Sequence, residues 1–190
     1  MHLTSISSFF LTLFISALAA PMSSELDKRQ IPVQGAYTLV ANRPNHPINM
    51  LKIQASGQRF YLGLPGPSSY CPVQVGSSCP NTTDTVIVNG AMYVMVPGGQ
   101  SLYVQRSGAL AYTQAHSSFR PDYLSSELGA FTDGSYRGPG GASFAACPVQ
   151  GKEGQWQVFS EVPGFVGRDC VCFAVGWKKW EGRVGAWQYT

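Results

Sequence analysis

The stretch 97–117 constrains the fold of this chain more than any other. It reads PGGQSLYVQRSGALAYTQAHS and combines turn signals with two alternating segments. Pro97 followed by two glycines marks a turn, because proline presets φ and glycine accepts positive φ. Residues 101–105 and 109–114 then alternate in side-chain character around a short connection that ends in Gly108. This pattern predicts a β-hairpin.

Similar signals recur along the chain and predict an all-β fold. Asn89-Gly90 is a strong hairpin signal between 85–88 and 91–96, so residues 85–114 are predicted to form a four-strand meander. Ser56-Gly57 indicates another hairpin. About twelve short antiparallel strands are expected, with no long amphipathic helix. A weak internal repeat among the segments RFYLG, SLYVQ and SFAACP favours a β-trefoil-like closed barrel. A two-sheet β-sandwich is the alternative.

The N-terminal residues carry processing signals. Residues 1–19 are predicted to be a signal peptide, since an apolar run is followed by a small-x-small site ending at Ala19. Residues 20–29 form a short pro-segment or linker that ends in the dibasic pair Lys28-Arg29, a predicted processing site. Residues 30–190 are expected to form a single all-β domain. No later apolar stretch is long enough to span a bilayer, so we expect secretion without a membrane partner.

Charge and cysteine content narrow the function further. The net charge is +3, without basic runs, which argues against a nucleic-acid partner. In an exported chain, cysteines are expected to form disulfides. Cys71 and Cys79 are the simplest pair, and Cys147 would join either Cys170 or Cys172. The loop containing the first pair also holds Asn81-Thr82-Thr83, an N-glycosylation sequon that predicts a glycan at Asn81.

Groups for catalysis are scarce. The predicted mature chain holds two histidines, His46 and His116. A small secreted ribonuclease would need a glutamate as general base in addition to two histidines. The only carboxylate between the two histidines is Asp84, so this base is missing. Three acidic residues fall in an irregular segment and are interpreted as a solvated loop rather than a glycosidase pair: Asp122, Glu127 and Asp133. No metal or cofactor pattern is present. We therefore expect a protein that is not an enzyme.

The tryptophans are the remaining candidates for a binding site. All four lie in the last fifth of the chain: Trp156, Trp177, Trp180 and Trp187. Aromatic faces stack on sugar rings. Trp180 and Trp187, in a Gly-rich polar tail, are candidate carbohydrate contacts, whereas Trp156 is interpreted as core packing. His116 is either a third polar contact or a residue that stabilises its turn.

The stretch 97–117 resembles the signature of the fungal secreted cell-wall proteins of the phialide-protein (PhiA) type, also known as IgE-binding proteins. The likeness extends to ANRPNHPINMLKIQASGQRFYLG, SYCP, ACP with WQVF, and CVCF, over roughly residues 36–175. In this family pattern a glycine stands where this chain has Cys172. The resemblance therefore implies that Cys170 pairs with Cys147 and that Cys172 is free or bonded to another chain.

The resemblance also implies a function. Members of this type have roles in the wall of spore-forming structures and in stress protection, and they are allergen-like. The expected partners are cell-wall polysaccharide, wall proteins and host IgE, and the expected location is extracellular, in the cell wall. The alternative is a carbohydrate-binding, lectin-like module or a secreted effector.

Overall fold

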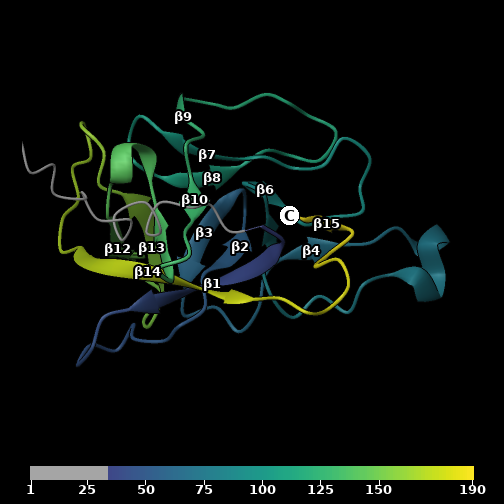
Figure 1. Cartoon of the computed structure of the whole chain (residues 1–190), viewed down its shortest axis with the longest axis horizontal. Helices are drawn as coiled ribbons and strands as arrows, with labels where there is room; N and C mark the ends of the chain where they lie inside the picture. The colour runs from purple at the N-terminus through teal and green to yellow at the C-terminus, as the bar shows by residue number, and fades with distance from the viewer. Residues whose placement is uncertain (1–33) are drawn as a thin grey trace, which may run out of the picture.

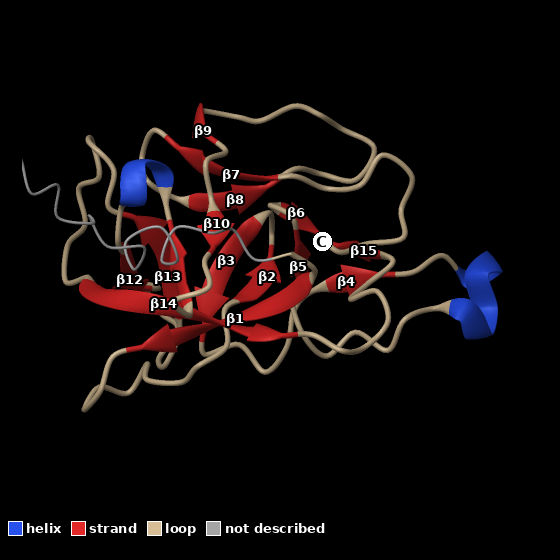
Figure 2. Cartoon of the chain, in the orientation of Figure 1, coloured by secondary structure: helices blue, strands red, loops and turns tan. Residues whose placement is uncertain are grey.

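A computed structural model describes residues 34–190, so the predicted signal peptide and pro-segment lie outside the described residues (Figure 1). The strands are β1 (Ala36–Asn42), β2 (Gln54–Ser56), β3 (Arg59–Leu62), β4 (Ser69–Tyr70), β5 (Ile87–Val88), β6 (Ala91–Met92), β7 (Leu102–Gln105), β8 (Leu110–Tyr112), β9 (Tyr123–Ser125), β10 (Gly129–Ala130), β11 (Ser135–Arg137), β12 (Phe144–Pro148), β13 (Trp156–Ser160), β14 (Val171–Lys179) and β15 (Gln188–Tyr189). Two short 3-10 helices accompany them, η1 (Val73–Ser78) and η2 (Pro139–Gly141). The prediction of an all-β protein is confirmed (Figure 2).

The hairpin predicted within 97–117 is formed by β7 and β8. Leu102 pairs with Tyr112 and Val104 with Leu110 across the antiparallel ladder. The connection requires Gly108, whose φ is +87° and whose added Cβ would lie 2.6 Å from the Ser160 carbonyl oxygen. Every residue of both strands is buried. The alternating sequence therefore lies inside the fold on both faces, unlike an ordinary surface hairpin.

The second hairpin also forms, and the predicted four-strand meander is present only in part. β5 and β6 pair around Asn89 and Gly90, which both have positive φ, as a primed turn requires. This hairpin pairs with β1, whereas β7–β8 joins β3 and β9 near the other end of the ladder path. An isolated bridge between Ala91 and Ser101 connects the two hairpins. The two hairpins thus touch at a single bridge, and their longer pairings are with strands that are distant in sequence.

The long strand β14 links the two halves of the main sheet. Its first residues, 171–173, pair with β12, and residues 174–179 pair with β1. β11 adds to β14 at residues 175–176. In the described chain the path of paired strands from β6 to β9 stays open. The closed β-trefoil barrel is therefore not confirmed, and the two-sheet alternative fits better.

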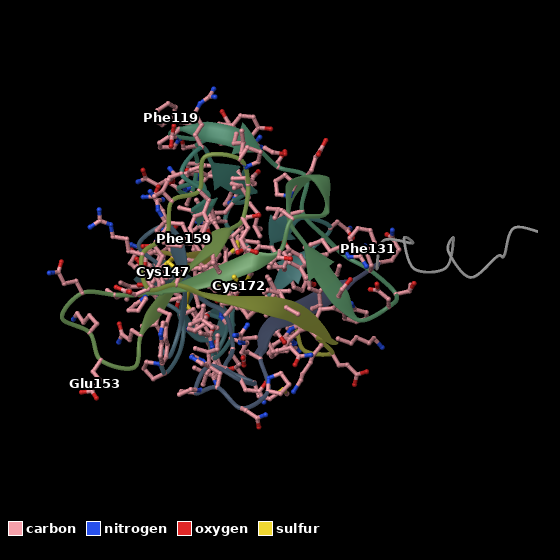
Figure 3. The ribbon with its side chains drawn as sticks, turned by 90° about the vertical axis from the view of Figure 1, so that its left-hand side faces the viewer. Phe119, Phe131, Cys147, Glu153, Phe159 and Cys172 are labelled. Carbon is pink, nitrogen blue, oxygen red and sulfur yellow. A yellow bond between two sulfur atoms is a disulfide. The ribbon has the colours of Figure 1, made fainter. Side chains whose placement is uncertain are left out.

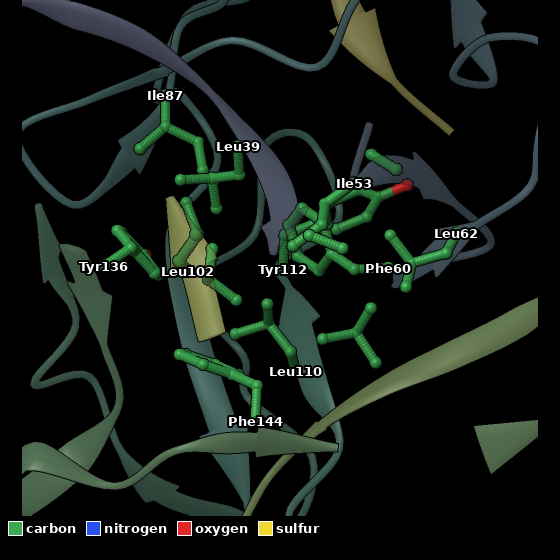
Figure 4. Close-up of a cluster of buried hydrophobic side chains, with 14 of the residues drawn as sticks. Leu39, Ile53, Phe60, Leu62, Ile87, Leu102, Leu110, Tyr112, Tyr136 and Phe144 are labelled. Atoms are coloured by element: carbon green, nitrogen blue, oxygen red, sulfur yellow. The ribbon is translucent and has the colours of Figure 1, made fainter. Parts of the chain in front are cut away.

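The core lies between these strands. Large buried side chains come from β1, β3, β7, β8, β11 and β12, and include Leu39, Phe60, Leu62, Leu102, Leu110, Tyr112, Tyr136 and Phe144 (Figure 4). Phe60 and Tyr112 meet edge to face, with ring centroids 5.4 Å apart. Full burial of side chains of this size stabilises the fold by about 1.5–3 kcal/mol each. The pairing of residues far apart in sequence is what brings them together.

Candidate functional site

The disulfide loop and the C-terminal tail enclose a hollow at one end of the molecule. η1 lies at that end of the long axis, away from β12 and β13 (Figure 1). The hollow has a volume of about 580 Å³ and is named here the Trp180 hollow. Its lining comes from three separate segments and consists of Ser77, Ser78, Cys79, Pro80, Asn81, Met95, Trp180, Arg183 and Val184. Two residues predicted from sequence, Asn81 and Trp180, therefore meet here.

Trp180 is held in place by its own turn. Its backbone N–H donates to the Ala36 carbonyl at 2.9 Å, which extends the pairing of β14 with β1. Its indole Nε1–H donates to the Arg183 carbonyl at 2.6 Å. The ring lies directly over Gly182, where an added Cβ would be 2.7 Å from the ring atom Cζ2. With its one polar atom occupied, the half-buried indole can offer the hollow only its apolar surface.

The opposite wall is fixed by covalent and ionic links. A disulfide joins Cys71 to Cys79 and closes the loop that contains η1. Beyond the sequon, the Asp84 carboxylate lies 2.6 Å from the ammonium of Lys52. The Thr83 hydroxyl donates to the same carboxylate at 2.9 Å. The short segment that carries Asn81 is therefore anchored on both sides, and Asn81 itself is exposed.

The other predicted contacts do not join the Trp180 hollow. Trp187 is half-buried, and its carbonyl accepts hydrogen bonds from the backbone N–H groups of Met95 and Val96. His116 is exposed and has φ of +61°, a left-handed conformation at the turn after β8. The neighbouring Ser117 N–H donates to the Gln114 carbonyl at 3.2 Å, which fits the interpretation of a turn residue. Neither side chain is among the described residues that line the hollow.

The remaining tryptophans contribute to packing. Trp156 and Trp177 are partly buried against the core. The indole N–H of Trp177 donates to the Phe131 carbonyl at 2.7 Å, and its ring lies 6.2 Å from that of Tyr37. The interpretation of Trp156 as a packing residue agrees with its place in β13.

The three loop carboxylates are engaged separately. Asp133 accepts hydrogen bonds from Ser135 and pairs with Arg137, and the hydrogen bonds from Ser135 are the main reason that the pKa of Asp133 is lowered. The Asp122 carboxylate lies 3.9 Å from the guanidinium of Arg106. Glu127 lines a different hollow, beside Arg137. Within residues 34–190, no group of three or more His, Cys, Asp or Glu side chains could hold a metal ion.

The second disulfide shows which cysteine pairs with Cys147, a choice between Cys170 and Cys172 that their spacing left open. Cys147 is bonded to Cys170, and Cys172 is a free, exposed cysteine. The Cys172 thiol donates to Glu161 Oε1 at 3.0 Å, and the Arg43 guanidinium donates to the Cys172 carbonyl at 2.6 Å. Figure 3 shows Cys147 and Cys172 on the ribbon that carries β12 and β14. The free thiol thus lies at the surface near a carboxylate.

Sequence reasoning missed the role of Gln100, which follows the turn glycines of the central stretch. This glutamine is 2% exposed, and its amide binds the backbone of Thr113, the residue directly after β8, and of Tyr189 in β15. A polar residue directly after Gly-Gly gives no signal of burial by itself. Part of the distinctive stretch 97–117 is therefore structural, because it fixes the C-terminal strand in the fold.

These features define a class: a disulfide-linked, antiparallel β-protein whose candidate site is an aromatic hollow. Residues 37–190 match the model of the PhiA-like secreted protein family, and the chain belongs to that family. A relative from Arthroderma benhamiae, described as an uncharacterized secreted protein, is 37% identical over an alignment of 207 positions that covers the whole of both chains. No solved structure matches the chain. The family resemblance and the secreted location are confirmed, and no helix among residues 34–190 is long and apolar enough to cross a membrane.

Proposed function

We propose that this secreted fungal protein is a non-catalytic component of the cell wall, held by contacts with wall polysaccharide or wall proteins. The observation that carries the non-catalytic part is the dispersal of its acids: Asp133 is paired with Arg137, and Asp122 faces Arg106. General acid–base catalysis needs such groups within hydrogen-bond reach of one reacting atom. The roles in spore-forming structures, in stress protection and in binding host IgE that the resemblance implies are part of this proposal.

Association with isolated walls tests the proposal. Purified secreted protein is incubated with fungal walls and sedimented over a range of protein concentrations. We expect saturable co-sedimentation, and elution by free sugar, by salt or by reductant identifies the kind of contact. A protein that stays in the supernatant at every concentration would contradict a wall role.

A second candidate is a carbohydrate-binding, lectin-like module or a secreted effector, and the Trp180 hollow favours it. A fixed indole with a free apolar surface costs little ordering entropy when a sugar stacks on it. The test is retention on insoluble chitin, β-1,3-glucan and mannan, with free-sugar competition, for the protein and for Asn81→Gln. Retention that is lost on Trp180→Ala but kept in Tyr70→Ala supports this candidate. Retention that is insensitive to Trp180→Ala removes it.

A further inference from the structure

Asn81 and Trp180 line the same hollow, although 99 residues separate them in sequence. Asn81 begins the sequon Asn81-Thr82-Thr83 and is exposed. We propose that Asn81 carries an N-linked glycan and that its first sugars occupy the Trp180 hollow, stacked against the Trp180 indole. The glycan then serves as an internal packing element that covers this end of the fold.

The attachment point is pre-positioned. Cys79, two residues before Asn81, is bonded to Cys71, and Asp84, three residues after it, is held by Lys52. Because the chain is fixed on both sides of Asn81, a sugar attached to Asn81 lies at the wall of the hollow and samples only a small volume. Little conformational entropy is therefore lost when the first sugars dock, which favours a defined contact over a freely moving chain.

The lining has the chemistry of a sugar site. Pro80, Val184 and Met95 provide apolar surface, and the Met95 side chain is unusually open, at 42% exposed. Hydroxyls of the two serines of η1 and the Arg183 side chain provide polar groups at the same hollow. Sugars are amphipathic in the same way, with apolar ring faces and hydroxyl edges. Ligand sites of roughly 300–1,000 Å³ are typical, so the hollow of about 580 Å³ has room for the first sugars.

The Trp180 indole provides the flat apolar surface on which a sugar ring can stack. Gly182 supports one side of the Trp180 ring, and the Arg183 carbonyl accepts its only N–H. Residue 182 must be glycine for this packing, since a Cβ there would lie within 3 Å of three ring atoms. The ring is thus rigid before any sugar arrives. A glycan in this position also makes Trp180 unavailable to external polysaccharide, so that lectin-like binding through Trp180 requires an unmodified Asn81.

A thermal-unfolding cycle tests the proposal. The protein is secreted from a filamentous fungal host, and mass spectrometry of the Asn81 peptide establishes glycan occupancy. Melting temperatures are compared for the intact glycoprotein, for protein trimmed by endoglycosidase H to a single N-acetylglucosamine, and for protein stripped by PNGase F, which converts Asn81 to Asp. The same series is run on Trp180→Ala and on Tyr70→Ala, an exposed aromatic control outside the hollow. Asn81→Asp controls for the charge that PNGase F introduces.

The expected result is specific to the first sugar and to Trp180. The trimmed protein should keep the Tm of the intact form, and the stripped protein should lose about 2–4 °C, the shift expected for a modest interaction in a domain of this size. In Trp180→Ala this loss should vanish, and in Tyr70→Ala it should persist. An unoccupied Asn81, or an equal loss of Tm in Trp180→Ala, would overturn the proposal. Wall co-sedimentation is scored separately, so failure here leaves the proposed function to its own test.

Discussion

Gln100 and Tyr189 exchange two hydrogen bonds across 89 residues of sequence. The Tyr189 N–H donates to Gln100 Oε1 at 2.8 Å, and Gln100 Nε2 donates to the Tyr189 carbonyl at 3.0 Å. The same amide donates to the Thr113 carbonyl at 2.9 Å. The side chain of Gln100 thereby bridges β15 and the residue that follows β8, and it joins the C-terminal strand to the central hairpin.

Replacing Gln100 with methionine, which has a similar shape, should therefore destabilise the protein strongly. Three buried backbone groups lose a partner, at a cost of about 1–3 kcal/mol each. The expected loss in unfolding free energy is therefore at least about 3 kcal/mol. Urea denaturation monitored by tryptophan fluorescence measures it. Gln114→Met, at an exposed position of the same stretch, should change stability by less than about 0.5 kcal/mol. Equal midpoints for the two variants would contradict the role assigned to Gln100.

The sequence predicts those parts of the fold that depend on residues close together in the chain, and it does not predict pairings between distant residues. The turns at Asn89-Gly90 and at Gly108 follow from local backbone chemistry, and both hairpins form. The position of the β5–β6 hairpin in the sheet depends on β1, which pairs with β5 on one side and with β14, more than 130 residues away, on the other. No local signal encodes such a pairing, so the sequence alone could not distinguish a closed barrel from an open path of strands.

The candidate site shows the same division. The spacing of Cys71 and Cys79 predicts their disulfide, which the structure contains, and the sequon singles out Asn81. Their position beside Trp180 depends on the C-terminal tail folding back so that β15 pairs with β4, the strand directly before the disulfide loop (Figure 1). The segment after His116, which the sequence predicts to be irregular, contains the short strands β9, β10 and β11. These short strands are specified by their partners and have no periodicity of their own.

Gly185 should not tolerate a methyl group. A Cβ at this buried position would lie 2.4 Å from Tyr189 Oη and 2.8 Å from Val86 Cβ. The Tyr189 hydroxyl cannot easily move, because it accepts from the Val86 N–H and donates to the Asp84 carbonyl, both at 2.9 Å. Gly185→Ala is therefore expected to cost about 1–3 kcal/mol through overpacking.

Gly66→Ala is the matched control for this change. The nearest atom to its added Cβ is the Thr83 carbonyl oxygen at 3.8 Å, an ordinary contact. Chemical denaturation of both variants under the same conditions gives the comparison. If Gly185→Ala unfolds at the same urea concentration as Gly66→Ala, the close packing around Tyr189 is not as described.

Stability should fall at alkaline pH because five tyrosines are buried: Tyr37, Tyr103, Tyr112, Tyr136 and Tyr189. Burial raises the pKa of Tyr37 and of Tyr112 to about 12, and it also raises the pKa of Tyr189. The unfolded chain ionises near pH 10, so above that pH the folded state binds more protons than the unfolded state. Stability is therefore fully present below about pH 10 and is lost progressively toward about pH 12, by about 1.4 kcal/mol per pH unit for each tyrosine.

Urea midpoints measured between about pH 9 and about pH 11 test this dependence. Tyr112→Phe removes one of the titrating groups, so its stability should fall less steeply with pH than that of the natural protein, even though it begins lower. For the buried tyrosines, the absorbance of the ionised form should rise over the same pH range in which the protein unfolds. Unchanged stability up to about pH 11 would contradict the expected proton linkage.

Glu161 should control the reactivity of Cys172. Their hydrogen bond of 3.0 Å raises the pKa of the exposed thiol, with smaller contributions from desolvation and from the carboxylate charge. Since the thiolate is the nucleophile, Glu161→Gln is expected to lower that pKa and to speed alkylation by iodoacetamide several-fold at neutral pH. The measurement is the alkylation rate as a function of pH, whose inflection should move to lower pH in Glu161→Gln. Glu153→Gln, on the loop between β12 and β13 (Figure 3), should leave the profile unchanged. Superimposable profiles for Glu161→Gln and the natural protein would show that Glu161 does not hold the thiol proton.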